Sequence, residues 1–171
     1  MKLSRNFRES EFACSCCGKV NISRKLVRCL QQLRDVVGPI TITCGYRCPR
    51  HNREVGGVKG SLHIAGMAAD CYFHDVSQFE AFLEATRIPD FLDGGIGIYL
   101  PYWKCKNKEC GHVWESEERT LCPKCGGRAK KKGNFLHLDV RGNGPARWGQ
   151  RLGVKCGFQE VFDLLRKDGK S

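Results

Sequence analysis

The chain has 171 residues, enough for one domain of ordinary size with a small insertion, and its 41% hydrophobic content excludes a disordered tail. Lys and Arg number 29 against 18 Asp and Glu, which gives a formal net charge of +11. Such a charge favours polyanionic partners, among them acidic wall polymers, nucleic acid and anionic membrane surfaces, without choosing among them.

Neither a membrane span nor an export signal is visible in the sequence. No apolar run approaches the roughly 18 residues that a membrane helix needs. The start of the chain also lacks the apolar stretch of a secretory signal. We therefore expect synthesis in the cytoplasm and, for any action on the cell wall, release by cell lysis or injection from a phage particle. In that setting the twelve cysteines indicate metal ligands and reduced thiols rather than disulfides.

Hydrophobic periodicity predicts both helices and strands. In chain order we expect a helix at 22–37, strands at 39–43 and 67–73, a helix at 76–86, strands at 94–99 and 135–140, and a helix at 158–166. Residues 1–21 are expected to be irregular, and residues 45–60 to be a glycine-rich, basic loop. Repeated βαβ units are missing, so we predict an α+β fold with a mainly antiparallel sheet flanked by helices.

The composition changes abruptly between Tyr102 and Gly133. This segment holds four cysteines and few aliphatic residues, and its nine Lys or Arg against four Glu account for +5 (9 − 4) of the net charge. We interpret residues 102–133 as a small zinc ribbon that is inserted into a main domain formed by residues 1–101 and 134–171.

Four cysteines of this insert have the spacing of zinc ligands: Cys105, Cys110, Cys122 and Cys125. The second pair stands in Cys-Pro-Lys-Cys-Gly-Gly, a two-residue-gap knuckle whose glycines let backbone amides approach the sulfurs. Zinc binds four thiolates tetrahedrally and stabilises a loop too small to form its own core. A site filled by four cysteines has no open position, so we expect a structural zinc here. The ribbon could also bind a partner.

A second set of metal-binding residue types lies outside the insert. His63 and Asp70 occur seven residues apart, and His137 and Asp139 occur on a predicted strand. A hydrolytic zinc site needs three nitrogen or oxygen ligands and one open position for water, which His63, Asp70 and His137 would supply. Side chains alternate along a strand, so Asp139 faces the same side as His137 and could reach the zinc-bound water.

The motifs Gly-Tyr-Arg (45–47), Ser-x-His-x-x-Gly-x-Ala-x-Asp (61–70), Gly-Gly-x-Gly-x-Tyr (94–99) and His-x-Asp-Val (137–140) together resemble a known family. The chain is similar to zinc D-alanyl-D-alanine carboxypeptidases and L-alanyl-D-glutamate endopeptidases, in the branch of phage endolysins and bacterial peptidoglycan hydrolases. The signalling domain of hedgehog proteins has the same fold. The similarity covers roughly Phe7 to Trp148 without the insert.

This resemblance implies a role for each matching residue. His63, Asp70 and His137 would bind a catalytic zinc, Arg47 would hold substrate and stabilise the oxyanion, and Ser61 would hydrogen-bond substrate. The expected cofactors are therefore two zinc ions, one catalytic and one structural. Many relatives carry a general-base carboxylate three residues before the last histidine, where this chain has Asn134. Asp139 could take over as base or could orient His137, and we favour the base.

Further cysteines form a cluster in the lead, Cys14, Cys16 and Cys17. They could be half of another metal site, completed by Cys29, Cys44, Cys48 or His51, or a thiol cluster without a ligand. The sequence leaves this open.

The function indicated is a zinc peptidase that hydrolyses a peptide bond of the bacterial peptidoglycan stem. The alternatives are a catalytically weak or inactive binding module of the same fold, which Asn134 favours, and a nucleic-acid binder, which the ribbon and the charge suggest. No recognition helix with clustered basic residues is visible, so we do not expect nucleic acid as a partner. We expect a monomer whose partners are the stem peptide and anionic wall polymers. A terminal D-Ala-D-Ala bond, an L-Ala-D-Glu bond and a cross-link are all compatible with these residues.

Overall fold

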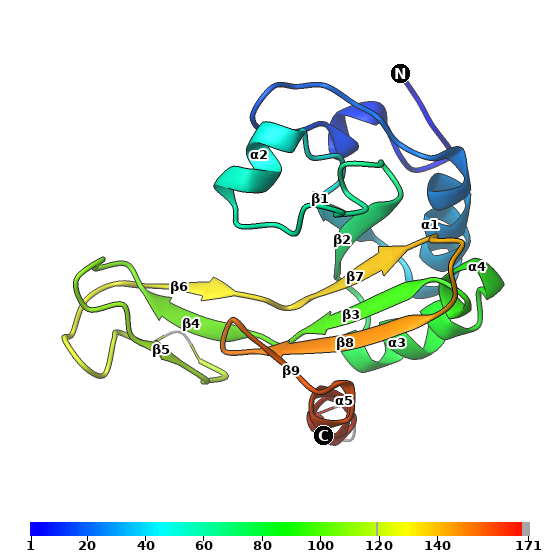
Figure 1. The fold of residues 1–171 in the computed structure, drawn as a ribbon. Coiled ribbons are helices and arrows are strands. Elements are labelled where there is room, and N and C mark those ends of the chain that lie inside the picture. The colour runs from blue at the N-terminus through cyan, green and yellow to red at the C-terminus, as the bar shows by residue number, and fades with distance from the viewer. Residues whose placement is uncertain (119, 169–171) are drawn as a thin grey trace.

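The computed structural model describes residues 1–118 and 120–168 (Figure 1). Its centre is a six-stranded sheet of mainly antiparallel strands, in which only β3 and β8 pair in parallel. The strand order is β1 (Ile40–Cys44), β2 (Ala68–Phe73), β7 (Phe135–Asp139), β3 (Gly95–Tyr99), β8 (Ala146–Arg151) and β9 (Val154–Cys156). The predicted α+β fold is confirmed.

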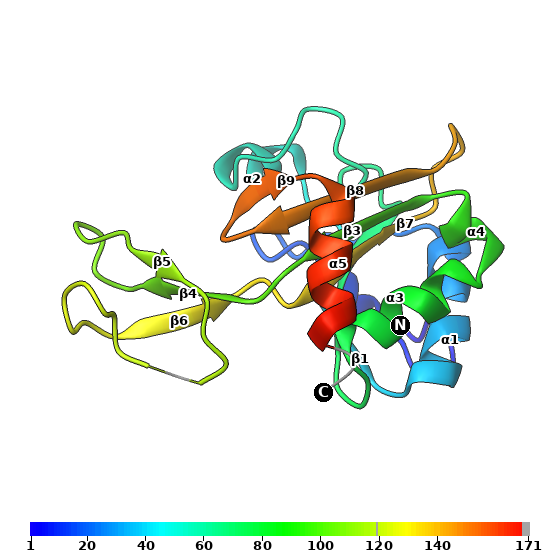
Figure 2. The same ribbon diagram turned by 90° about the horizontal axis from the view of Figure 1, so that it is seen from below.

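Helices cover one face of this sheet (Figure 2). They are α1 (Arg24–Val37), α3 (Gln78–Thr86), α4 (Pro89–Leu92) and α5 (Phe158–Asp168). The core lies between them and the sheet, where the alternate side chains of β7, such as Leu136 and Leu138, are fully buried. Because strand side chains alternate, His137 and Asp139 face away from these helices.

Local signals explain where the helices begin and end. Ser77 and Glu80 form a capping box at the start of α3, with each side chain accepting a hydrogen bond from the other's backbone N–H. The helix α1 ends at Gly38, whose φ of 79° is readily adopted only by glycine. Five of the buried residues of α1 are Leu26, Val27, Leu30, Leu33 and Val37, which confirms the helical spacing that predicted this element.

Opposite the helices, a long connection covers the other face of the sheet (Figure 1). It runs from β1 to β2 and contains α2 (Pro49–Glu54), a short helix in a segment expected to be entirely loop. Before α1, the chain forms a 3-10 helix, η1 (Glu9–Phe12), which contacts β1. The connection between β1 and β2 carries Arg47, Ser61 and His63, so it brings three candidate site residues over the sheet.

The segment 102–132 forms a separate three-stranded antiparallel sheet, in the order β5-β4-β6, that projects from one end of the main sheet (Figures 1 and 2). Its strands are β4 (Tyr102–Cys105), β5 (Val113–Trp114) and β6 (Ala129–Lys132). Trp103 is buried and faces Trp114 across the strand pair, while its Nε1 donates to the carbonyl of Ser116. The two tryptophans therefore pack this small sheet.

The helices and strands predicted from periodicity are present with shifts of one to two residues at their ends. The sequence reading missed α2, α4, β8 and β9, and with them the two strands at one edge of the main sheet. Among the residues that the structure describes, no helix is both long enough and apolar enough to cross a bilayer.

Candidate active site and metal centre

The candidate site is built across four neighbouring strands at the centre of the main sheet. Asp70 on β2 lies opposite His137 on β7, His137 lies opposite Gly97 on β3, and Gly97 lies opposite Trp148 on β8. These four residues therefore form a row on the face that the helices leave free. The register of the sheet alone places a carboxylate and an imidazole side by side.

Gly97 has no side chain because the indole of Trp148 crosses over it. A Cβ at this position would lie 2.4 Å from Cε2 of Trp148, closer than any real contact. The indole thereby packs beside His137, with ring centroids 5.0 Å apart. Gly95, two residues earlier on the same face, is similarly filled by the carboxylate of Asp139. The Gly-Gly-x-Gly-x-Tyr motif thus makes room for the side chains of the neighbouring strands.

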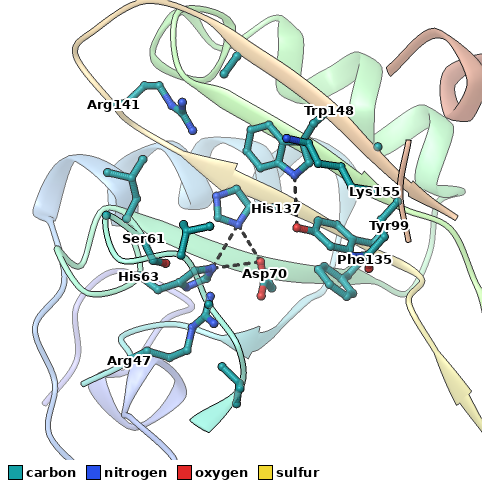
Figure 3. A pocket seen from close by; sticks show the side chains of 18 of the residues that line it. Arg47, Ser61, His63, Asp70, Tyr99, Phe135, His137, Arg141, Trp148 and Lys155 are labelled. Atoms are coloured by element: carbon teal, nitrogen blue, oxygen red, sulfur yellow. Dashed lines mark hydrogen bonds and ion pairs between the residues drawn. The ribbon is translucent and has the colours of Figure 1, made fainter. Parts of the chain in front are cut away.

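His63 reaches the row from the connection above it and is 1% exposed. Its Nε2 lies 3.2 Å from Nδ1 of His137 and 3.3 Å from Oδ1 of Asp70. Nδ1 of His137 and Oδ1 of Asp70 are 2.9 Å apart (Figure 3). The structure therefore brings the three predicted zinc ligands together, although His63 and His137 are far apart in the chain. The three short distances all join the same three atoms, one from each side chain.

In each imidazole one nitrogen, here called the inner nitrogen, faces the other two ligands, and the outer nitrogen faces away. The hydrogen-bond partner of the outer nitrogen shows which of the two carries the proton. Nδ1 of His63 lies 2.7 Å from the carbonyl oxygen of Gly45, which can only accept a hydrogen bond. Nε2 of His137 lies 3.2 Å from Oδ2 of Asp139, which as a carboxylate also only accepts. In the neutral rings the protons are therefore on these outer nitrogens, and the two inner nitrogens present lone pairs to Asp70.

Three acceptors within 3.3 Å of one another repel unless a proton or a cation lies between them. Separations of about 3.3 Å are those between nitrogen or oxygen ligands on one tetrahedral zinc ion with bonds of about 2.0–2.1 Å. The donor set thus fits zinc. The outer hydrogen bonds of both histidines are of the kind that fix the orientation of metal-ligating imidazoles.

The same crowding changes the acidity of the three groups. Burial by itself lowers the pKa of His63 and His137, but hydrogen bonds to the carboxylates outweigh it and raise both pKa values. Burial raises the pKa of Asp70, yet the two adjacent imidazoles hold this pKa well below its usual range. The site therefore favours positive charge at its centre.

Asp139 does not reach the open side of the site. Its side chain is fully buried, and its oxygens accept hydrogen bonds from Nε2 of His137, the backbone N–H of Gly95, and the guanidinium and backbone N–H of Arg141. Its ion pair with Arg141 measures 2.6 Å. Asp139 shares a face with His137 as expected, but it lies beside the outer nitrogen. The carboxylate is thus placed to orient His137, while the general-base role expected from the sequence stays a prediction.

Arg47 and Ser61 both line the pocket above the three ligands (Figure 3). Arg47 comes from the connection after β1, where its backbone N–H donates to the carbonyl of His63. Within the described part of the chain, its buried Nε has no hydrogen-bond partner. A guanidinium held in this way is available to an anionic group in the pocket.

The pocket is a cavity of about 940 Å³ with a basic lining. Its charged lining residues, apart from the histidines, are Arg47, Asp70, Arg141, Arg147 and Lys155. Asp70 is thus the sole carboxylate among the described residues that line it. Aromatic side chains form a further part of the wall: Tyr99, Phe135 and Trp148 (Figure 3).

Asn134 lies outside this lining. It precedes β7 with a φ of 60°, a backbone conformation that asparagine tolerates better than most residues, and its N–H donates to the carbonyl of Tyr99. The residue therefore shapes the entry into β7, and its side chain does not serve as a base in the pocket.

Two clusters of cysteines are separate from this site. Cys105, Cys110, Cys122 and Cys125 have sulfur atoms that all lie within 4.8 Å of one another, so the four residues selected from the ribbon motif come together. The second cluster combines Cys14, Cys16 and Cys17 of the lead with Cys48.

The sequence reading missed several residues around the three ligands. Trp148 and Tyr99 pack beside the ligands, with Nε1 of Trp148 donating to the Tyr99 hydroxyl at 3.3 Å, and Arg141 holds Asp139. Cys44 lies 3.8 Å from the outer nitrogen of His63. Tyr99 belongs to the Gly-Gly-x-Gly-x-Tyr motif, so side-chain alternation on that strand was an available signal, whereas Trp148 lies on a strand that the sequence pattern does not predict.

The sequence model of the Peptidase M15 family matches residues 5–103, which contain Arg47, Ser61, His63 and Asp70. The chain belongs to the Peptidase M15 family. As an M15 protein it is a zinc-dependent peptidase, and the matched range covers more than half of the chain. A comparison with curated proteins found no match.

Proposed function

We propose that this M15 peptidase hydrolyses a peptide bond of the bacterial peptidoglycan stem, with His63, Asp70 and His137 holding its catalytic zinc. The observation that carries the proposal is the convergence of two inner imidazole nitrogens and one carboxylate oxygen, within 3.3 Å of one another, at the base of an open pocket. Zinc bound there would polarise the scissile carbonyl and lower the pKa of bound water.

The other residues would orient the reactants. Arg47 would bind a substrate carboxylate or the developing oxyanion, because its guanidinium enters the pocket with an unpartnered Nε among the described residues. Ser61 would donate to the substrate backbone. Asp139 would hold the outer N–H of His137, so that the lone pair of the inner nitrogen stays directed at the metal.

Tyr99 would supply a further hydrogen bond in the pocket. The Tyr99 hydroxyl accepts from Trp148, which leaves its own O–H free to donate into the pocket. Burial raises the pKa of Tyr99, so the hydroxyl stays protonated at neutral pH. It would therefore act as a hydrogen-bond donor to the substrate.

The charge of the pocket supports an acidic peptide as substrate. Arg141 is neutralised by Asp139, but Arg47, Arg147 and Lys155 have no carboxylate partner among the described residues that line the pocket. Peptidoglycan stems carry free carboxylates at their D-residues and their terminus, and such groups would be attracted by this lining. A phage endolysin or a bacterial wall hydrolase would use such a pocket, and the protein would meet its substrate after release from the cell.

The three-stranded sheet would be an inserted zinc ribbon, residues 102–133, within a catalytic domain of residues 1–101 and 134–171. Cys105, Cys110, Cys122 and Cys125 would hold a structural zinc. Exposed lysines at 130–132 on β6 would add contacts to anionic wall polymers, and we propose that the monomer acts alone.

The test is digestion of purified peptidoglycan and of defined stem peptides, with products identified by mass spectrometry. The zinc-loaded wild type should release muropeptides and His63→Ala should not. The terminal residue lost or the new amino terminus gained identifies the bond. A wild type that holds zinc at the triad yet releases no more product than His63→Ala would overturn the proposal in favour of a binding module.

A further inference from the structure

The lead cysteines form a turn that repeats the zinc-binding turn of the ribbon. In the ribbon, Cys122 N–H donates to the carbonyl of Gly127 at 2.8 Å, and Gly126 N–H donates to the carbonyl of Cys122 at 2.8 Å. In the lead, Cys14 N–H donates to the carbonyl of Lys19 at 2.8 Å, and Gly18 N–H donates to the carbonyl of Cys14 at 2.8 Å. The two turns thus have the same hydrogen bonds at the same spacing.

The glycine that follows each turn has the same backbone conformation. Gly18 has a φ of 69° and Gly126 a φ of 65°, both in the left-handed region that favours glycine. In both turns the two cysteines that flank the gap are separated by two residues, Cys14 with Cys17 and Cys122 with Cys125. The lead therefore contains a complete knuckle.

Two more cysteines complete a set of four around this knuckle. The sulfurs of Cys14, Cys16, Cys17 and Cys48 all lie within 4.8 Å of one another, as do the four sulfurs of the ribbon. Cys16 and Cys48 are 3.6 Å apart at sulfur, near the roughly 3.8 Å between ligands on one tetrahedral zinc with bonds of about 2.3 Å. A disulfide needs about 2.05 Å, and these cysteines are free.

The surroundings of the cluster suit thiolates. The backbone N–H of Cys48 donates to the sulfur of Cys14 at 3.4 Å, and the N–H of His51 donates to the sulfur of Cys48 at 3.4 Å. The guanidinium of Arg50 donates to the sulfur of Cys16 at 3.0 Å. Four thiolates around one zinc carry a net charge of −2, which these donors offset in part.

We propose that Cys14, Cys16, Cys17 and Cys48 bind a second structural zinc, in addition to the metal sites of the pocket and the ribbon. Soft thiolates in a tetrahedral set select zinc over the harder divalent metals. Each bound cysteine releases its thiol proton to solvent on binding. His51 stays outside the set, because its Nε2 is engaged by the Ser15 hydroxyl at 3.2 Å and its Nδ1 lies near Glu54.

This zinc would fasten the lead to the connection that carries Arg47. Cys48 follows Arg47 directly, and the lead already contacts this part of the chain where Tyr46 N–H donates to the carbonyl of Phe12. Gly45 lies so close to Phe12 that a Cβ would approach its Cα to 2.6 Å. The site would therefore close a contact between two segments that otherwise meet through few hydrogen bonds.

The first experiment measures zinc in the reduced, full-length protein by mass spectrometry of the elements. The wild type should hold about three zinc ions per chain, and Cys17→Ser and Cys122→Ser should each lose about one, additively in the double variant. Cys156→Ser, which removes a thiol outside both clusters, is the matched control and should lose none. Equal zinc in Cys17→Ser and wild type would overturn the proposal.

A second experiment leaves the lead unchanged, so that misfolding of a variant cannot decide the result. In a chain with Cys122→Ser and Cys125→Ser, cobalt should still give the intense near-ultraviolet absorption of thiolate bound to cobalt. Absence of this band would contradict the assignment. In separate single variants, metal loss in His51→Ala with retention in Cys16→Ser would also contradict it, because that pattern would replace a cysteine of the proposed set by histidine.

Discussion

The pocket triad and the cysteine clusters are held by different kinds of backbone. Asp70 and His137 stand opposite each other on paired strands in the middle of the sheet, over a fully packed core. The cysteines of both clusters come from turns and from the ends of elements, such as Cys105 at the end of β4 and Cys48 before α2. Those of the ribbon belong to a small sheet with few buried side chains. We therefore expect the triad to keep its geometry without metal, and the clusters to depend on a bound metal for theirs.

His137→Ala should give the largest effect on catalysis and a small effect on the fold. Losing the metal removes several kcal/mol of transition-state stabilisation, so kcat/KM on a stem peptide should fall by at least about 10³-fold. Circular dichroism should remain that of the wild type, because the strands still pair. Cys122→Ser is the matched comparison from a cluster, and it should lower the melting temperature while leaving the triad's zinc in place. Equal loss of activity in both variants would show that the triad and the cysteine cluster do not have separate roles.

Arg47→Ala should come next, because it removes a charge from the pocket and leaves the three ligands intact. Loss of an oxyanion donor typically costs about 10²–10³-fold in kcat. Zinc content should be unchanged, since Arg47 is not one of the three ligands and its backbone N–H, which donates to the carbonyl of His63, is kept in the variant. Arg47→Lys should recover part of the rate on substrates with a free carboxylate. A variant that loses zinc together with activity would show instead that Arg47 holds the site together.

Asp139→Asn should weaken zinc binding, because it removes the charge that orients the outer nitrogen of His137. Such partners of metal-bound histidines typically contribute about 10–100-fold to metal affinity or activity. If Asp139 acts only by orientation, activity should return when zinc is supplied in excess, and the pH profile should keep its shape. A rate that stays low at full zinc occupancy and has lost its acidic limb would identify Asp139 as the base after all.

Sequence reasoning could find the residues of this site but not the direction in which each atom points. Strand alternation places His137 and Asp139 on one face, and the side chains do lie there. Alternation does not say which imidazole nitrogen faces Asp70, and that choice puts Asp139 beside the outer nitrogen. The role of Gly97 was equally hidden, because it depends on Trp148 of a strand that is distant in sequence.

The strand β8 escaped prediction because its sequence, Ala-Arg-Trp-Gly-Gln-Arg, has no alternating apolar pattern. Packing against its neighbours positions it instead: Gly149, its one buried residue, lies under Val161 of α5, where a Cβ would approach Cγ2 to 2.2 Å. The cysteine set around Cys14 stayed open in the sequence for a similar reason, since four residues could complete it and Cys48 comes from a distant segment. Both cases depend on tertiary contacts that a local pattern does not contain.

Gly97→Ala should test whether the sheet itself holds the triad. The added methyl group would overlap the indole of Trp148, and overpacking of this kind typically costs about 1–3 kcal/mol of unfolding free energy. Displacement of the indole from His137 should also lower kcat/KM. Gly142→Ala is the control, because a Cβ there meets nothing within 4 Å. Chemical denaturation of both variants measures the difference, and equal stability would show that the indole adapts freely.

The smallest expected effect concerns the link between the two sheets. Arg151 of β8 donates two hydrogen bonds, of 2.7 and 2.8 Å, to Glu115 next to β5, and both side chains are well exposed. Exposed pairs contribute little, so Glu115→Gln should lower the melting temperature by no more than about 3 °C at neutral pH.

The pH dependence of that small difference follows from the charge of the pair. The hydrogen bonds from Arg151 lower the pKa of Glu115 in the folded protein. The contribution is therefore present above the unfolded pKa of about 4.3 and disappears as the pH falls through the lower folded pKa. Wild type and Glu115→Gln should then melt together in acid. A large difference in melting temperature at neutral pH would mean that contacts with β8 stabilise the small sheet. The ribbon would then depend less on metal than we expect, and would differ less from the pocket.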